Sequence, residues 1–117
     1  RDWGYAPEYV EAMWRMLQAE SPDDFVVATG TKYSIRDFLG FAFEHVGLNW
    51  EDYVRVDPRF IRPAEVDALV GDSSKMLAAT GWKATVLPPE LAKIMVDADR
   101  QFLTAQGTSW IDRPYGD

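Results

Sequence analysis

The sequence predicts one α+β domain with about four helices and short, non-consecutive strands. The 117 residues are enough for a single domain with its own core. Apolar residues recur at helical spacing in four stretches, and short apolar runs of strand type lie between them. No internal repeat or low-complexity linker divides the chain. Residues 1–106 are therefore expected to form the domain, and 107–117 a tail without periodicity.

The first helix is expected to begin near Pro7, since proline suits a first helical turn. Glu8 and Glu11 favour the positive end of the helix dipole, and Ser21-Pro22 stops the helix. Its buried face is predicted from four apolar residues at helical spacing, namely Val10, Met13, Trp14 and Leu17.

A short apolar run at residues 24–28 predicts a strand that is closed by Thr29-Gly30. A second helix follows, because Ser34 and Asp37 resemble a capping box with Asp in place of Glu. Gly47 suits the end of this helix. Its predicted buried stripe consists of Ile35, Phe38, Leu39, Ala42, Phe43 and Val46.

A short third helix is expected after Asp72, which can cap it, with Gly81 ending it in the left-handed conformation. Trp82 should fold back on its last turn. Residues 85–87 are extended in this prediction, and Pro88-Pro89 introduces the last helix. Its apolar residues at helical spacing are Leu91, Ile94, Met95, Ala98 and Phe102.

The most informative segment is VRVDPRFIRPAEVD at residues 54–67. A strand-like start runs into two X-Pro steps, which hold Asp57 and Arg62 out of helical conformations. Stiff backbone that carries guanidinium groups suits binding of a phosphate or carboxylate. The alternative is a loop whose charges pair with one another on the surface. Arg55 is expected to face solvent on a strand, and Arg59 is either a surface or an inter-subunit residue.

Composition excludes several classes of function. The net charge of −7 argues against general binding of nucleic acid, which needs a basic surface. The chain has no cysteine, so disulfides and thiolate metal sites are excluded. No apolar run approaches the roughly 20 residues of a membrane span, and no signal peptide opens the chain. We therefore expect a cytoplasmic protein.

Catalytic machinery is also missing from the sequence. The eight glycines include no Gly-x-Gly pair, and no tyrosine has a lysine four residues later. The only histidine, His45, lies near a helix end, where structural use is expected. Asp97 and Asp99 would point about 200° apart on a helix, so they form no acid/base dyad. Ser73 and Ser74 start a helix. We predict no catalytic, cofactor-binding or metal-ligating residue in this chain.

Several blocks, taken together, resemble one family. RDWGYA at residues 1–6 and YVEAMW at 9–14 are followed by VRVDPRF and RPAEVD within 54–67. Gly71-Asp72, the GWK triplet at 81–83 and the last helix continue the match to about residue 102. Together these blocks resemble the C-terminal portion of GDP-mannose 4,6-dehydratases. The RDWG and RPxEVD blocks are specific, whereas GWK recurs across many nucleotide-sugar enzymes.

The resemblance implies an extended short-chain dehydrogenase/reductase. Its N-terminal Rossmann domain, absent here, would hold NADP and the catalytic residues, and its C-terminal portion would hold the nucleotide sugar. The implied reaction converts GDP-mannose to GDP-4-dehydro-6-deoxymannose. Hydride leaves C4 for the nicotinamide, water is lost across C5 and C6, and the hydride returns to C6. The product feeds fucose and rhamnose pathways. The implied partners are GDP-mannose, the chain's own Rossmann domain and further subunits of a homo-oligomer.

The resemblance also implies three substrate-binding residues. Arg1 and Arg62 match arginines that contact the GDP portion, and Glu65 matches an acid near the nucleotide. A carboxylate there either accepts hydrogen bonds from ribose or guanine or orients an arginine. Both roles stay open.

The chain departs from the family pattern at two places. Only residues 48–53 precede the 54–67 segment where many members carry a longer insertion, and Glu8 stands where aspartate is frequent. Residues 110–117 have no counterpart. Because aromatic residues at the start have nothing before them to pack against, we expect a fragment or processed piece of a longer chain.

Three hypotheses of function follow. In the first, the chain is the substrate-binding portion of a GDP-mannose 4,6-dehydratase and is inactive alone. In the second, it belongs to another nucleotide-sugar dehydratase or epimerase. In the third, it is a stand-alone interaction or sensor domain that has lost catalysis.

Overall fold

The computed structural model describes residues 1–61 and 68–106. These residues form four α-helices and two short 3-10 helices, so the four predicted helices are confirmed. The bounds are Ala6–Leu17 (α1), Ile35–His45 (α2), Trp50–Asp52 (η1), Pro58–Phe60 (η2), Ser74–Thr80 (α3) and Pro88–Gln106 (α4). No β-strand occurs in the described part of the chain, so the strands of the α+β prediction are not confirmed. The absence of a Rossmann domain stays a prediction.

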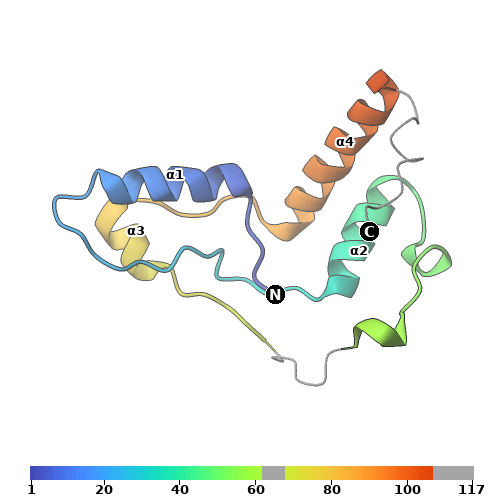
Figure 1. Ribbon diagram of the computed structural model, residues 1–117, viewed down its shortest axis with the longest axis horizontal. Coiled ribbons are helices and arrows are strands. Elements are labelled where there is room, and N and C mark those ends of the chain that lie inside the picture. Colours follow the sequence, from blue (N-terminus) through green and yellow to red (C-terminus); the bar gives the residue numbers. More distant parts are fainter. Residues whose placement is uncertain (62–67, 107–117) are drawn as a thin grey trace.

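The helices form two lobes. Figure 1 shows α1 and α3 side by side at one end and α2 and α4 at the other, with the N-terminus between them. The radius of gyration is 17.9 Å, against roughly 13 Å for a compact domain of this length. The molecule is therefore elongated rather than built around one central core.

The α1/α3 lobe contains the main buried cluster. The Trp82 ring is buried and lies edge-on to Tyr9, with ring centroids 6.0 Å apart. Its indole N–H donates to the carbonyl of Glu8 at 3.0 Å. Gly81 has φ +70° and ends α3 in the left-handed conformation, which confirms this part of the prediction. The buried cluster consists of Ala12, Met76, Trp82 and Ala84.

The predicted buried face of α1 is wrong. Its four apolar residues are between 59% and 82% exposed, and α1 instead turns Tyr9, Ala12 and Met16 toward the core. Both sets recur at helical spacing, so periodicity alone could not decide between them. The exposed set consists of Val10, Met13, Trp14 and Leu17 and is called the outer face of α1 below.

The α2/α4 lobe begins at the predicted capping box, which is confirmed. The Ser34 hydroxyl accepts from the Asp37 N–H at 3.1 Å, and the Asp37 carboxylate accepts from the Ser34 N–H at 2.8 Å. Phe38 is half-buried and packs against Trp3, with centroids 5.3 Å apart. The predicted stripe of α2 is only partly correct, because Ile35 and Val46 are exposed and the other four residues are half-buried. In the last helix Leu91 is buried, whereas Met95 and Phe102 are about half exposed.

His45 has a structural position, as expected. Its Nε2 lies 2.8 Å from Oδ1 of Asp97, so the pair links the end of α2 to α4. Asp97 is half-buried, whereas Asp99 is exposed.

The segments expected as strands lie outside any sheet. Residues 24–28, 54–56 and 85–87 have no strand assignment. A side chain provides hydrogen bonds in place of a neighbouring strand at one of them. The Glu8 carboxylate accepts from the backbone N–H groups of Thr85 at 3.0 Å and Val86 at 3.3 Å, and from the Thr85 hydroxyl.

None of the described helices is both long and apolar enough to cross a bilayer.

Candidate functional site

Arg1 is the one predicted site residue that the structure describes; Arg62 and Glu65 lie outside the described residues. The Arg1 backbone nitrogen donates to the carbonyl of Tyr33 at 2.7 Å, and the Tyr33 N–H donates back to the Arg1 carbonyl at 2.9 Å. This exchange is the pattern of one hydrogen-bonded pair between antiparallel strands. It holds the backbone of Arg1 in place.

Asp2 joins three segments that are distant in sequence. Its Oδ1 accepts from the Thr29 N–H at 3.0 Å and from the Thr29 hydroxyl at 2.6 Å. Its Oδ2 accepts from the N–H groups of Gly30 at 3.1 Å and Gly71 at 3.2 Å. Asp2, Thr29, Gly30 and Gly71 are called the Asp2 junction below.

The hydrogen bonds of the junction favour the ionised carboxylate. Burial raises the pKa of Asp2, but the donors from Thr29, Gly71 and Gly30 outweigh burial and leave this pKa below its usual value. At neutral pH Asp2 is therefore a charged acceptor. Bonds to a charged acceptor are shorter and stronger than neutral ones.

Gly71 lies too close to its neighbours for any side chain. A Cβ at this position would stand 2.3 Å from the Cβ of Ala28 and 3.2 Å from Cγ1 of Val26. This close approach brings the Gly71 N–H within reach of Asp2. The Gly71-Asp72 block therefore needs glycine at its first position, where no side chain fits.

The two residues that follow Arg1 and Asp2 in the chain help to line an apolar pocket. It has a volume of about 380 Å³, which is within the range of small-molecule sites. Its lining comes from the N-terminal segment, α2 and α4, namely Trp3, Gly4, Phe38, Leu91 and Met95. Sequence reasoning missed this pocket. The contiguous RDWG block pointed to the right segment but not to the helices that complete it.

The described part of the 54–67 segment contains one charge pair, between Asp57 and Arg59. Asp57 is extended (φ −96°, ψ 116°), which confirms that the X-Pro step holds it out of helix. Its carboxylate accepts from the Arg59 N–H at 3.0 Å and pairs with the guanidinium, with Nη2 2.6 Å from Oδ2. The Arg59 hydrogen bonds lower the pKa of Asp57, and that carboxylate raises the pKa of Arg59. This part of the segment matches the alternative of a charge-paired surface loop.

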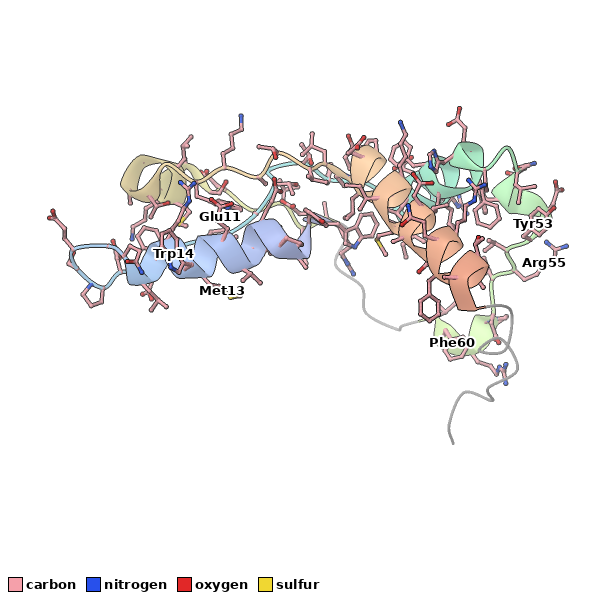
Figure 2. All side chains as sticks on the ribbon, turned by 90° about the horizontal axis from the view of Figure 1, so that it is seen from above. Glu11, Met13, Trp14, Tyr53, Arg55 and Phe60 are labelled. Atoms are coloured by element: carbon pink, nitrogen blue, oxygen red, sulfur yellow. The ribbon has the colours of Figure 1, made fainter. Side chains whose placement is uncertain are left out.

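Arg55 faces solvent, as predicted, but not on a strand. Its guanidinium donates to the carbonyls of Glu51 and Val54, each at 3.1 Å. Figure 2 shows Arg55 beside Tyr53 at the end of the molecule formed by η1.

The structure thus connects Asp2, the neighbour of Arg1 and a residue that was not predicted, to Gly71. Asp2 follows Arg1 directly, and it binds Gly71, which follows the 54–67 segment by four residues. One sequence signal could have pointed to this contact, because Asp2 and Gly71 both belong to the blocks that carry the family resemblance.

The comparisons with known proteins agree with this resemblance. The family model described as GDP-mannose 4,6 dehydratase matches residues 1–95. The chain is 56% identical over 99 residues to GDP-mannose 4,6 dehydratase 2 of Arabidopsis thaliana, covering 85% of this chain and 26% of that protein. It is 42% identical over 120 aligned positions to the human GDP-mannose 4,6 dehydratase, covering 88% and 32%.

A solved structure shares the fold. RMD from Pseudomonas aeruginosa complexed with NADPH has a TM-score of 0.70 and 19% sequence identity to this chain, covering 83% of this chain and 31% of that one. The chain spans about a quarter to a third of the length of the curated relatives named above.

Proposed function

The chain belongs to the GDP-mannose 4,6-dehydratase family, and we propose that it forms the GDP-mannose-binding portion of such an enzyme. The observation that carries this proposal is the family match over residues 1–95, combined with the small share of each relative that the chain spans. The intact parent would be a lyase that converts GDP-mannose to GDP-4-dehydro-6-deoxymannose. The portion by itself would be inactive, since its sequence offers no catalytic group.

Arg1, Arg62 and Glu65 are the proposed contacts to the GDP portion. A diphosphate is best bound by guanidinium groups whose positions are fixed before binding. The paired backbone of Arg1 supports such a role. Glu65 would accept hydrogen bonds from the nucleoside or orient an arginine.

The cofactor of the parent is proposed to be NADP. A protein of the same fold, RMD, was solved in complex with NADPH. The residues of this chain do not fit a dinucleotide, because the sequence has no Gly-x-Gly turn for its phosphates. NADP would therefore be held by the N-terminal portion of the parent, where it would accept and return the hydride.

That N-terminal portion is also the proposed partner of the outer face of α1. This face exposes four large apolar side chains at helical spacing. Met13 projects from the side of α1 that faces away from α3 (Figure 2). An exposed apolar stripe of this kind marks a surface that another part of a protein covers. Homo-oligomer formation and a cytoplasmic location stay predictions.

The test compares two arginines of the same segment in the intact parent. Arg62→Ala should weaken GDP-mannose binding by roughly 1–3 kcal/mol, or about 5- to 150-fold in Kd, because a charged hydrogen bond to phosphate is lost. Arg55→Ala is the matched control, since its guanidinium binds carbonyls of its own segment. Calorimetric titration measures both.

Two outcomes would contradict the proposal. Unchanged affinity of Arg62→Ala removes the direct phosphate role, and an equal loss in both variants indicates general electrostatics. Titration with UDP- and dTDP-sugars distinguishes the alternative: equal binding of all three nucleotide sugars favours another dehydratase or epimerase.

A further inference from the structure

The Asp2 junction uses the full hydrogen-bonding capacity of one carboxylate. An ionised carboxylate offers about four lone-pair sites, and Asp2 fills them with four donors from Thr29, Gly30 and Gly71. No acceptor capacity is left for a ligand. Asp2 can therefore affect ligand binding only by fixing the positions of the residues that it contacts.

Arg1, the residue next to Asp2, is hydrogen-bonded to the same segment, residues 29–33. Arg1 exchanges two backbone hydrogen bonds with Tyr33, while Asp2 binds Thr29 and Gly30 a few residues earlier. Within this turn the Thr29 and Thr31 hydroxyls lie 2.9 Å apart. The first two residues of the chain are thus fixed against residues 29–33 at both ends.

We propose that Asp2 is a positioning residue for nucleotide-sugar binding, which fixes Arg1 and the chain at Gly71 relative to each other. The inference deepens the proposed function and rests on it. Binding groups need to be held within about 0.5 Å of their productive positions, and residues that do not touch the ligand supply this accuracy. Asp2 does so through three backbone N–H groups and one hydroxyl.

Asparagine cannot replace Asp2 at this junction. Its side chain has the same size, but one oxygen becomes an NH₂ group, which is a donor. One oxygen cannot serve all four donors, so the amide would face at least one backbone N–H. The contacts of Asp2 with Thr29, Gly30 and Gly71 should loosen while the helices of both lobes stay intact.

The experiment uses the intact parent enzyme and measures GDP-mannose affinity and turnover. Asp2→Asn should raise Kd and KM about tenfold and leave kcat within about twofold, since the proposed chemistry lies in the other portion. Asp72→Asn is the matched control. Asp72 also accepts a backbone hydrogen bond, from Ser74 at 2.9 Å, but only within the start of α3. It should keep the parent's Kd.

A second variant pair covers the case in which Asp2→Asn fails to fold. Thr29→Val removes one donor to Asp2, whereas Thr29→Ser keeps the hydroxyl. The valine variant should raise Kd about threefold and the serine variant should restore it. Equal Kd values for valine and serine would overturn the inference.

A double-mutant cycle with Arg1→Ala distinguishes positioning from general stability. If Asp2 acts through Arg1, the fold-increase in Kd that Asp2→Asn causes should shrink in the Arg1→Ala background. Full additivity would overturn the inference while leaving the proposed function in place. If Arg1→Ala itself leaves Kd unchanged, or the parent does not bind GDP-mannose, the assignment that failed is the proposed function, and the inference falls with it.

Discussion

Carboxylate side chains supply many of the backbone hydrogen bonds that connect distant residues in this protein. Asp2 binds the N–H groups of Thr29, Gly30 and Gly71, and Glu8 binds those of Thr85 and Val86. A backbone N–H that is removed from water needs an acceptor, and in a sheet the neighbouring strand supplies it. In the described residues these acids take that role.

Gly71→Ala should destabilise the protein by roughly 1–3 kcal/mol, because the new Cβ would meet the Ala28 Cβ at 2.3 Å and neither can rotate away. Gly40→Ala is the matched control. It lies inside α2 with open space around it, so it should stabilise by roughly 0.5–1 kcal/mol. Urea unfolding of both variants measures the difference. Equal effects would show that the close approach at Gly71 does not exist.

The pH dependence of stability should depend on Asp2. Because the pKa of Asp2 is below its usual value in the folded state, its contribution is fully present above pH 3.8 and is lost as pH falls through the folded pKa. Between pH 6 and pH 3 the unmodified chain should therefore lose more stability than Asp2→Asn. Thermal unfolding across this range measures the slopes. Asp99→Asn, an exposed carboxylate on α4, is the control. Identical slopes for all three proteins would contradict the assignment.

At the scale of elements, α1 is the helix with two possible inner faces. Tyr9, Ala12 and Met16 face the α1/α3 core, while the outer face contains Trp14 and Leu17. The apolar residues of α1 cover both of these faces, and its charged residues Glu8, Glu11 and Arg15 occupy the remaining side. The structure covers one of its faces, and the proposed N-terminal portion would cover the other.

Leu17→Gln should change the stability of the isolated chain by less than about 0.5 kcal/mol, because this side chain is 82% exposed. Met76→Ala, at a fully buried position, should cost roughly 2–5 kcal/mol. In the intact parent Leu17→Gln should become clearly destabilising, since the outer face would be covered there. Chemical denaturation of both proteins measures this. An unchanged parent would remove α1 from the proposed contact with the N-terminal portion.

Polar side-chain contacts of α3 add to the packing of its buried Met76. Lys75 in α3 lies 2.7 Å from the Asp23 carboxylate, donates to the Asp24 carbonyl at 2.9 Å, and stands over the Phe25 ring. These contacts tie α3 to the segment after α1. Because all three partners are exposed or half exposed, the contribution of the ion pair itself is modest.

At the scale of the whole molecule, two helical lobes meet near the N-terminus (Figure 1). The Asp2 junction lies in this region, and the apolar pocket takes residues from the N-terminal segment, α2 and α4. Such an arrangement suits a portion that completes a binding site together with another domain. Ligand sites are frequent at domain interfaces.

The isolated 117-residue chain should show no dehydratase turnover. Its sequence has no Gly-x-Gly turn for binding a nicotinamide dinucleotide and no tyrosine followed four residues later by a lysine. Incubation with GDP-mannose and NADP, followed by product analysis, measures this. The intact parent is the positive control. Product formed by the pure chain would show that catalytic groups are present in it.

The sequence by itself determined the four helices, the capping box at Ser34, the glycine end of α3 and the family. These follow from local rules, because helix periods, caps and turns depend on neighbouring residues. The sequence did not determine which face of α1 is buried, whether the apolar runs pair as strands, or that Asp2 would bind Gly71. Only the tertiary structure decided these points. Burial, strand pairing and a hydrogen bond across 69 residues depend on which distant segments meet, and no local pattern encodes that meeting.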